Sequence, residues 1–362
     1  MFLQELQLQQ FRCFADKKLY FSAPITLITG NNGIGKTSIV EAIYYLSYFK
    51  SFRSHLVSDL MQTGTESFFL KGQFRLQNLN EEHSIQIGYS QKRKSIKFDQ
   101  KQLSSHRQVL ELFQVVTLTE DDIDLIKGYP AGRRAFIDQA VLLANPQALQ
   151  VYREFKQILA CRNAFLERYQ HNIDRTEFAI WTQKLLEISC KIQQMRQDLM
   201  SQVQAQVNEL IEQFFDGIYR ISLAYEPKLP ILGQNSEVCL RAIEGLFYQE
   251  RGLKRSLFGA HLDDLVFQIN GQKARIFASR GQQKLICLLC KLSLILIPRG
   301  NSMKPMLLVD DFISDFDKIR LQNLIKFFIS RQNQIIITAP FFDSGLQNLL
   351  EKADPDVQSI TS

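Results

Sequence analysis

"ITGNNGIGKTS" at residues 28–38 decides the fold of this 362-residue chain. Its glycines, lysine and threonine have the G-x-x-x-x-G-K-T spacing of a loop that wraps a triphosphate. Residues 25–29 form an apolar run that predicts a buried strand, and residues 37–49 predict a helix. A phosphate at the start of that helix meets unpaired N–H groups and the positive end of the helix dipole. The stretch therefore predicts a strand, a phosphate-binding loop and a helix.

This loop supplies the ligands that ATP and Mg²⁺ need. Lys36 brings a point charge to the β- and γ-phosphates, and Thr37 brings a hydroxyl to Mg²⁺. The predicted cofactor-binding residues of the loop are Gly30, Asn31, Asn32, Gly33, Ile34, Gly35, Lys36, Thr37 and Ser38. The alternative, a glycine-rich turn before an ordinary helix, does not explain why the strand, the loop, the helix and both side chains occur together.

The composition is that of a globular protein with a mildly basic charge. Hydrophobic residues make up 45% of the chain and charged residues 22%, and the net charge is +6. This charge permits a polyanionic partner, and a solvated basic surface is the plain alternative. The six cysteines are scattered, no signal peptide opens the chain, and no stretch approaches the ~20 apolar residues of a membrane span. We therefore expect a cytoplasmic protein without a membrane partner. Cys287 and Cys290 lie in an apolar helical run and are expected to be buried thiols.

Hydrophobic periodicity changes twice along the chain and indicates a split domain. Residues 2–29 and 67–99 have strand patterns, and residues 119–220 have the period of long helices that fit an antiparallel hairpin. Strand character returns in "ISLAYEP" and in "DLVFQINGQKARIFAS", where Asn270-Gly271 is a hairpin signal. The chain closes with a helix at 281–297, a strand at 305–310, a helix at 318–331 and a strand at 334–338. We expect an α/β ATPase lobe from residues 1–118 and 258–362, with a mainly helical lobe from 119–257 inserted.

The second motif is acidic, "MLLVDDFISDFD" from Met306, and its apolar start predicts a buried strand that ends in aspartate. Ligands of an open α/β sheet lie at the carboxyl ends of the strands, so Asp310 is expected to hold Mg²⁺ beside Thr37, usually through water. Asp311 is expected to orient and polarise the attacking water, which makes Asp311 and Lys36 the predicted catalytic residues. The alternative is a surface turn after a core strand.

A third motif, "FASRGQQKLICLLCKL", opens another helix. Its cofactor-binding residues are expected to be Ser279, Gly281 and Gln282, because small residues at a helix start can bind phosphate. The chain thus has two phosphate-binding helix starts and one P-loop lysine. Two chains arranged head to tail would use both, each capping the γ-phosphate bound by the other.

Together these motifs resemble those of the ATPase head class that includes transporter ATPases and chromosome-maintenance proteins. The resemblance implies an ABC-type P-loop ATPase head with a split lobe and a mixed sheet, an inserted α-helical lobe and no long coiled coil. Further segments narrow the resemblance to the RecF family of DNA replication and repair proteins. They are "LQLQQFRCF", "SFRSHLVSDLM", "EDDIDLIKGYPAGRRAFID" and "GAHLDDLVFQING", which follow one another in the family's order along almost the whole chain.

The resemblance implies an ATP-dependent homodimer with weak, DNA-stimulated ATP hydrolysis. It implies binding to double-stranded DNA near gaps, at single-strand/double-strand junctions, and a partner called RecR that acts with RecO to load a recombinase. By the same resemblance, Arg12 lies near the nucleotide and Gln114 senses the metal ion. The loop that crosses the dimer interface matches Ser314, Asp315 and Asp317.

The sequence also departs from the family pattern. Ala260 and Leu262 replace a proline and an arginine in G-P-H-R-D-D, which puts any role of that arginine in doubt. Thr338 stands where transporter relatives have a histidine, and Asp311 stands where most of the class has glutamate. A transporter ATPase subunit is the main alternative, and a nucleotide kinase and a structural protein are others. The basic turn Lys92, Arg93 and Lys94 is a candidate DNA contact, with a solvated turn as its alternative.

Overall fold

The computed structural model describes residues 1–76, 80–168, 175–214, 219–231, 236–297, 304–312, 316, 318–331, 333–340, 350 and 357–361. Contacts divide the chain into two compact units, Met1–Asp122 with Leu294–Ser362, and Ile123–Ser293. Residues 258–293, which we expected in the ATPase lobe, share their contacts with the second unit, because the strand in this segment pairs with a strand of the helical region. The first unit is therefore still split in sequence, with a longer insertion than expected.

The N-terminal strands of the first unit form an antiparallel sheet, as the alternating patterns predicted. Its strands are β1 (Phe2–Phe11), β2 (Phe14–Tyr20), β4 (Ser67–Leu76), β5 (Glu81–Ser90), β6 (Arg93–Phe98) and β7 (Lys101–Gln102), in the order β2-β1-β4-β5-β6-β7. One face of the sheet is apolar and buried, and the other is polar. This alternation is what an antiparallel sheet with one covered face requires.

A second sheet in the same unit is entirely parallel. It consists of β3 (Ile25–Gly30), β8 (Val115–Thr119), β12 (Met306–Asp310), β13 (Ile335–Pro340) and β14 (Gln358–Thr361), in the order β14-β3-β13-β12-β8. We did not predict β8 or β14. Register pairs Asp310 with Thr338 on β13, and Thr338 with Ile28 on β3. The carboxyl ends of these strands therefore meet at one edge, where the P-loop begins.

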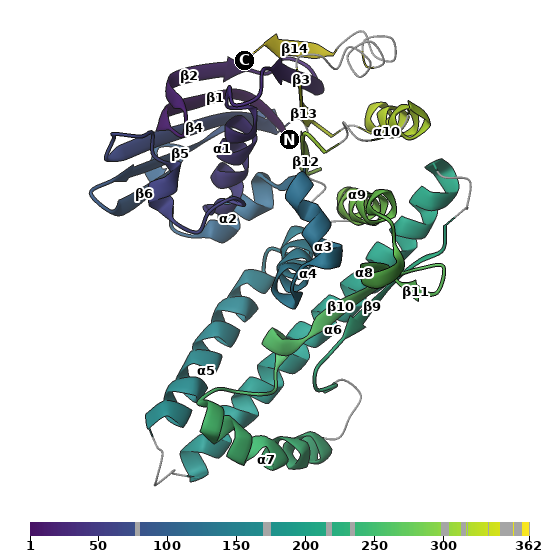
Figure 1. The fold of residues 1–362 in the computed structure, drawn as a ribbon. Coiled ribbons are helices and arrows are strands. Elements are labelled where there is room, and N and C mark those ends of the chain that lie inside the picture. Colours follow the sequence, from purple (N-terminus) through teal and green to yellow (C-terminus); the bar gives the residue numbers. More distant parts are fainter. Residues whose placement is uncertain are drawn as a thin grey trace. The chain divides into compact units, whose positions relative to one another are not determined.

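Helix α1 (Lys36–Tyr48) lies between the two sheets and contacts strands of both (Figure 1). It matches the helix expected at 37–49. Almost all of its residues are buried, including Ile39, Ile43 and Tyr45. A helix that is buried on nearly all sides needs cover on nearly all sides, and the two sheets contribute to it. The unit also contains α2 (His106–Leu112) and α10 (Lys318–Ser330).

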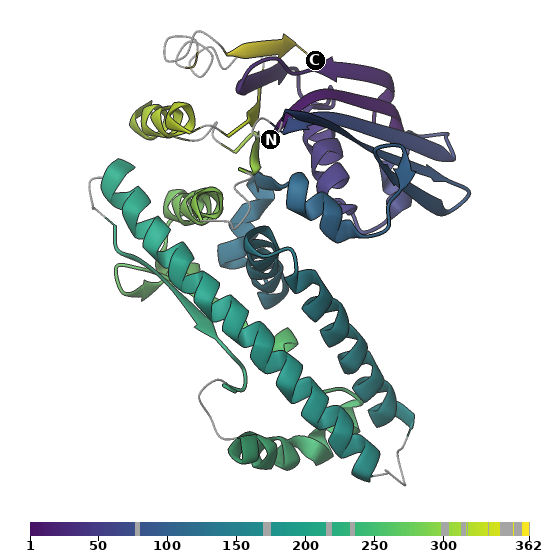
Figure 2. The same cartoon turned by 180° about the vertical axis from the view of Figure 1, so that it is seen from behind.

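The second unit is mainly helical, as predicted. Its helices are α3 (Asp124–Lys127), α4 (Pro130–Ala144), α5 (Ala148–Arg168), α6 (Arg175–Phe214), α7 (Ser236–Leu253), α8 (Ala274–Phe277) and α9 (Arg280–Leu296), whose last residues belong to the first unit. Helices α5 and α6 pack side by side, which confirms the expected helical hairpin (Figures 1 and 2). Both expected thiols of α9, Cys287 and Cys290, are buried.

Three short strands complete the second unit, β9 (Ile221–Glu226), β10 (Asp264–Ile269) and β11 (Gln272–Lys273). Asn270 and Gly271 form the hairpin turn between β10 and β11 with φ of 51° and 80°, as their sequence predicted. Residues 274–277, which we expected to continue the strand pattern, form α8 instead. Among the described residues, no helix is long and apolar enough to cross a membrane.

Candidate nucleotide-binding site

One pocket of the first unit collects the P-loop and the acidic motif. It is lined by Arg12, Cys13, Asn32, Gly33, Gly35, Lys36, Thr37, Ser38, Arg53, Asp59, Met61, Thr63, Asp310, Asp311 and Thr338. These residues come from the β1–β2 turn, the P-loop, the segment after α1, and the ends of β12 and β13. Residues more than 270 positions apart in the chain are thus brought to one site by the parallel sheet.

The P-loop has the backbone conformation that its glycines permit. Gly33 and Gly35 have φ of 85° and 105°, in the left-handed region that favours glycine. A Cβ at Gly35 would lie 2.5 Å from Cys13 Sγ and 2.5 Å from Phe14 Cζ, so no side chain fits there. The ammonium of Lys36 donates to the carbonyl oxygens of Gly30 at 2.7 Å and Asn31 at 3.0 Å. The loop therefore wraps around its own lysine at the start of α1.

The hydroxyl of Thr37 and the carboxylate of Asp310 meet, as we predicted for a magnesium site. Thr37 Oγ1 donates to Asp310 Oδ1 at 3.2 Å, and Thr338 Oγ1 donates to the same oxygen at 2.7 Å. Burial raises the pKa of Asp310, while these two hydrogen bonds and the charges of Arg53 and Lys36 oppose the increase. A carboxylate and a hydroxyl side by side supply the oxygen ligands that Mg²⁺ prefers.

Asp311 lines the same pocket in a strained conformation. Its φ of 50° lies in the left-handed region, which is uncommon for a residue with a side chain. Its backbone N–H donates to Thr338 Oγ1 at 3.2 Å, so one threonine connects both aspartates. Strained residues of this kind concentrate at functional sites. Thr338, which we considered only as a substitute for a histidine, thus orients the acidic motif.

Arg12 reaches the pocket, but its guanidinium is held by helix α1. It donates to both carboxylate oxygens of Glu41, at 2.8 and 2.7 Å, and to the backbone oxygen of Asp59 at 2.6 Å. Sequence reasoning missed Arg53, which also lines the pocket and is only loosely paired, 3.6 Å from Glu41. The Arg53 side chain is 42% exposed, whereas that of Arg12 is 19% exposed. The signal was present in "SFRSHLVSDLM", where Arg53 is the single arginine and no lysine occurs.

The structure does not bring Gln114 to this pocket. Gln114 immediately precedes β8, whereas the pocket lies at the carboxyl edge of the sheet, where Thr119 of β8 pairs with Asp310. Five residues of strand separate Gln114 from Thr119, which is about 16 Å. The backbone oxygen of Gln114 accepts from Met306 N, at the amino end of β12. Ser314, Asp315 and Asp317 lie outside the described residues.

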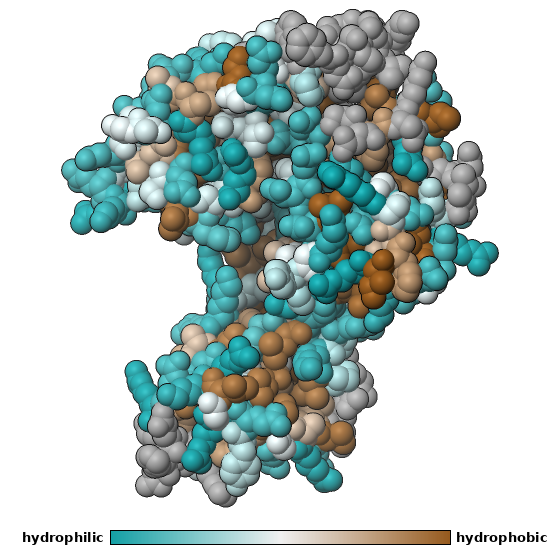
Figure 3. Space-filling view, viewed as in Figure 1, coloured by the Kyte–Doolittle hydropathy of each residue, from teal (hydrophilic) through white to brown (hydrophobic). Residues whose placement is uncertain are grey.

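The third motif caps helix α9 in the second unit. Ser279 N donates to Gln282 Oε1 at 2.9 Å, and Gln282 N donates to Ser279 Oγ at 3.3 Å, the reciprocal pair of a capping box. Ser279 and Gly281 are exposed. The preceding helix α8 exposes Ile276 (68%) and Phe277 (60%), and Figure 3 shows hydrophobic surface over α8. The start of α9 is therefore an accessible, preorganised helix end bordered by apolar side chains.

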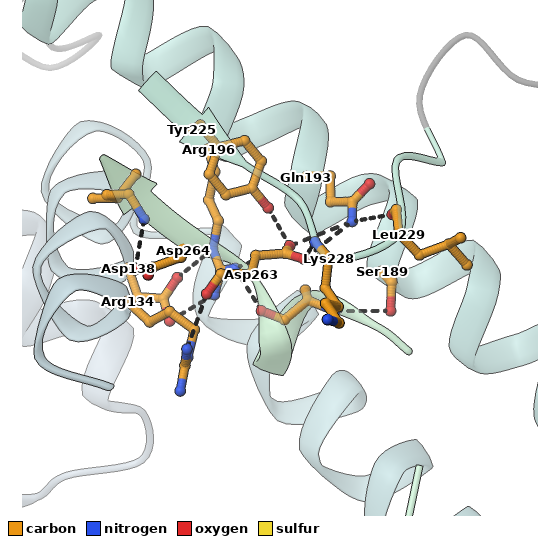
Figure 4. Close-up of polar contacts among 12 residues, drawn as sticks. Arg134, Asp138, Ser189, Gln193, Arg196, Tyr225, Lys228, Leu229, Asp263 and Asp264 are labelled. Carbon is orange, nitrogen blue, oxygen red and sulfur yellow. Dashed lines mark hydrogen bonds and ion pairs between the residues drawn. The ribbon is translucent and has the colours of Figure 1, made fainter. Parts of the chain in front are cut away.

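The "GAHLDD" and "PAGRRAFID" segments meet in a buried polar network of the second unit (Figure 4). Asp263 accepts hydrogen bonds from Tyr225 Oη and, at 2.9 Å, from Lys228 N. Arg133 binds both carboxylate oxygens of Asp264, at 2.7 and 2.9 Å, and Arg134 donates to the backbone oxygen of Asp263 at 2.9 Å. Burial raises the pKa of Asp263, although its hydrogen bonds and a nearby arginine lower it. This family-like motif therefore joins α4 to β9 and β10.

Leu262 belongs to the "GAHLDD" segment, where it ends the 3-10 turn Ala260–Leu262, and it is half-buried. Arg196 of α6 contacts this turn instead, because it donates to the backbone oxygen of Ala260 at 2.7 Å. Arg196 also binds both carboxylate oxygens of Asp138, at 2.9 and 3.1 Å. The turn thus has an arginine contact from another helix, although position 262 is leucine.

The basic turn at residues 92–94 is divided by the sheet. Lys94 faces the buried side, where its ammonium donates to the backbone oxygen of Phe49 at 2.7 Å and lies 4.8 Å from the centre of the Tyr45 ring. Burial lowers the pKa of Lys94. Arg93 alternates to the other side, and Lys92 occupies the turn with φ of 60°. The three cations do not form one patch.

Comparison with known proteins finds relatives over almost the whole chain. The family model described as RecF/RecN/SMC N terminal domain matches residues 2–353. The chain is 30% identical over 344 residues to a DNA replication and repair protein RecF of Desulfitobacterium hafniense, which covers 93% of both chains. It is 29% identical over 359 residues to the RecF of Bacillus cytotoxicus, covering 98% of this chain and 95% of the relative.

Solved structures agree with this relationship. A structure of the recombination mediator protein RecF-ATP in the RecFOR pathway matches with a TM-score of 0.86 and 25% identity, over 95% of this chain and 93% of that one. The corresponding RecF-ATPrS structure matches with a TM-score of 0.83. An Smc head domain from Pyrococcus furiosus matches with a TM-score of 0.56 at 16% identity, which shows a shared fold alone. The fold is thus that of an ABC-type and Smc-like ATPase head.

Proposed function

Because the chain belongs to the RecF family of DNA replication and repair proteins, we propose that it is an ATP-dependent DNA-binding protein of recombinational repair and replication restart. Its activity in this proposal is weak, DNA-stimulated hydrolysis of ATP to ADP and phosphate. The similar structures named RecF-ATP and RecF-ATPrS support ATP as the nucleotide. The proposed DNA ligand is duplex DNA near single-strand gaps. The proposed protein partner is a second copy of the chain, with which it forms an ATP-dependent homodimer.

One observation carries the proposal, namely the convergence of a lysine, a hydroxyl and two aspartates in one pocket. Lys36 lies at the start of α1, Thr37 and Asp310 are 3.2 Å apart, and Asp311 lines the same pocket. A loop of backbone N–H groups at a helix start suits the phosphates, and the oxygen donors suit Mg²⁺. These residues therefore fit a magnesium–triphosphate complex by their donor types and by their arrangement.

The residues of this pocket divide the work of hydrolysis. Lys36 and the P-loop amides bind and orient the phosphates, and Thr37 and Asp310 hold Mg²⁺, which neutralises phosphate charge when it is bound. Asp311 orients the attacking water and accepts its proton. The shorter side chain of aspartate, compared with glutamate, reaches this water less well, which fits slow turnover. Arg53 adds a half-exposed cation to the same wall of the pocket.

The exposed start of α9 completes the site from a second copy of the chain. In this arrangement Ser279, Gly281 and Gln282 of one copy cap the γ-phosphate that the P-loop of the other binds. ATP then drives dimerisation because each nucleotide contacts both chains. The dimer is proposed to bind DNA junctions and RecR, and to help load a recombinase together with RecO.

Replacing Lys36 tests the proposal. Lys36→Met removes the ammonium and keeps an unbranched apolar side chain, so ATP binding, ATP-driven dimerisation and DNA-stimulated hydrolysis should all be lost. Lys17→Met is the matched control, because Lys17 lies on β2 outside the pocket. Titration with a fluorescent ATP analogue, sedimentation and phosphate release measure the three effects. Near-normal nucleotide affinity in folded Lys36→Met protein would overturn the assignment of the pocket.

A further inference from the structure

The antiparallel sheet of the first unit carries a straight row of lysines and glutamines. Strand register places Lys18 opposite Gln7, Gln7 opposite Lys71, Lys71 opposite Gln86, Gln86 opposite Lys97, and Lys97 opposite Gln102. These six residues, here called the lysine row, cross strands β2-β1-β4-β5-β6-β7 in their spatial order. Figure 1 labels the strands of this sheet from β2 to β6. A cation on every second strand, with only neutral amides between, sets this row apart from its neighbours.

The lysine row lies on the face of the sheet that is turned away from the core. Neighbouring residues on the same strands, Leu6, Leu70, Ile87 and Phe98, are buried, at 0 to 6% exposure. Since successive side chains of a strand point to opposite faces, the row lies on the polar face. Lys18 and Lys97 are exposed and Lys71 is half-buried. The sheet therefore presents the charges of the lysine row on its outer face.

The spacing of the row follows from the geometry of a sheet. Hydrogen-bonded strands lie about 4.8 Å apart, so lysines on alternate strands are about 10 Å apart and the three span roughly 20 Å. One strand of B-DNA carries a phosphate every ~3.4 Å along the helix axis, so this length faces about six phosphates. A line of regularly spaced cations therefore has the length and charge to follow a regular linear polyanion.

Few anions on this face compete for the cations of the row. Lys18 is paired with Glu5 at 2.9 Å, but among the described residues neither Lys71 nor Lys97 forms an ion pair. Asp16 lies in the next row, at the β2 edge, opposite Gln9. A shallow groove follows that next row, and its lining includes Gln9, Phe69, Gly88, Ser95 and Arg93. Lys71 and Lys97 thus border a groove in the middle of the sheet.

We infer that this face binds the sugar–phosphate backbone of duplex DNA, with Lys71 and Lys97 as phosphate contacts. The inference rests on the proposed function, which makes DNA the partner but does not say which surface meets it. Glutamine amides between the lysines donate hydrogen bonds to phosphate and sugar oxygens without reading sequence. Binding at this face is consequently independent of DNA sequence and sensitive to salt.

Removing two charges from the row gives a quantitative test. In full-length protein with ATP, Lys71→Gln combined with Lys97→Gln should weaken binding to duplexes of any sequence. The slope of log affinity against log salt should become less steep by about 1.8, since each lost phosphate contact removes ~0.9. Lys101→Gln is the matched control, because Lys101 is on the same sheet but pairs with Phe98, whose side chain faces the core.

Gly88 allows a charge to be added without removing any native contact. A Cβ at Gly88 would have nothing within 4 Å, and Gly88 is not among the positive-φ glycines. Gly88→Glu therefore places a carboxylate beside the lysine row at little cost in stability, and Gly88→Gln is its neutral control. Gly88→Glu should weaken DNA binding, whereas Gly88→Gln should leave it within about twofold of the unchanged protein by the scale of neutral surface changes. Affinity for a fluorescent ATP analogue should be equal in all variants.

The outcomes separate this surface from the proposed function. Unmutated protein that binds no duplex DNA with ATP would overturn both the DNA-binding function and this inference. Unmutated protein that binds DNA, with unchanged affinity and salt slope in the Lys71/Lys97 double variant and in Gly88→Glu, would overturn the surface alone. A loss of DNA binding in the double variant and in Gly88→Glu, but not in Lys101→Gln or Gly88→Gln, supports the inference.

Discussion

The guanidinium of Arg12 binds both carboxylate oxygens of Glu41, a buried residue of the P-loop helix α1. The two nitrogen–oxygen distances are 2.8 and 2.7 Å, and the Glu41 side chain is 0% exposed. Ser51 Oγ donates to the same carboxylate at 2.5 Å, and Arg53 lies 3.6 Å from it. Glu41 therefore ties the β1–β2 turn and the segment after α1 to the helix that starts at the P-loop.

Removing the arginine of this pair should destabilise the first unit. Arg12→Gln leaves a buried carboxylate with one hydroxyl and one distant cation, which we expect to cost about 3–5 kcal/mol of unfolding free energy. Denaturant unfolding followed by circular dichroism measures this loss. The double variant Arg12→Gln with Glu41→Gln should recover a substantial part of it, because no buried charge remains. If the double variant loses as much unfolding free energy as Arg12→Gln and Glu41→Gln lose together when measured singly, Arg12 does not compensate the buried charge of Glu41.

The parts of this site that follow from local patterns could be predicted from the sequence. Glycine spacing, Lys36 and Thr37 specify the P-loop, and the apolar run before Asp310 specifies a buried strand that ends in a carboxylate. In a parallel sheet, both must reach the same edge. Their 3.2 Å contact confirms that reasoning.

Long-range pairing could not be predicted in the same way. Whether Arg12 points to a nucleotide or to Glu41 depends on packing between segments 29 positions apart, which no local pattern encodes. Gln114 shows the same difficulty, because it precedes β8, a strand that we did not predict, and the position of Gln114 relative to the pocket depends on that strand. Residues 274–277 also depend on context, since "ARIF" is equally compatible with a strand and with the short helix observed.

A second ion pair, in the helical unit, is fully buried and gives a further test of stability. Arg162 binds both carboxylate oxygens of Glu250, at 2.9 and 2.6 Å, and its guanidinium lies 4.7 Å from the ring centres of Phe178 and Phe258. Arg162→Met should lower the unfolding free energy of this unit by about 3–5 kcal/mol, because Glu250 would stay buried without its cation.

Fluorescence of Trp181, the only tryptophan of the chain, reports this change. Trp181 packs against the core of the helical unit, so its signal follows unfolding of that unit. The control is Arg162→Met combined with Glu250→Gln, which removes both charges and keeps an acceptor for Leu257 N. It should be more stable than Arg162→Met alone. Equal stability of the two variants would show that Glu250 has another source of compensation.

His261 should make the stability of the helical unit depend on pH. Burial lowers the pKa of His261, and the charges of Arg134, Arg162 and Arg196 lower it further. The unfolded chain therefore takes up a proton near pH 6.5, the reference value, while the folded chain does so only at lower pH. The contribution of His261 to the unfolding free energy should be fully present above pH 6.5. It should be lost as the pH decreases towards the folded pKa, by at most about 1.4 kcal/mol per pH unit.

The variant His261→Gln isolates this contribution, because glutamine does not titrate. Unfolding followed by Trp181 fluorescence at several pH values between neutral and mildly acidic should give a flatter pH dependence for the variant than for the unmutated protein. Contributions from other titrating groups, including Asp263, are common to both proteins and cancel in the difference. Parallel curves would show that His261 takes up its proton equally well in the folded chain.

The most discriminating prediction concerns the exposed start of α9. If Ser279 caps nucleotide bound by a second chain, Ser279→Arg should leave ATP binding to the monomer intact, because the P-loop lies in the same chain and is unchanged. ATP-driven dimerisation should be blocked, since a bulky cation would occupy the position of the γ-phosphate. Mixing Ser279→Arg with Lys36→Met protein should restore some ATP-dependent pairing and hydrolysis. In the mixed dimer, one composite site carries both substitutions and the other carries neither.

Sedimentation with ATP measures pairing. Ser279→Ala, which loses only a hydroxyl, controls for the loss of the cap on α9. Dimerisation of Ser279→Arg protein at the level of the unmutated chain would show that each subunit completes its own site.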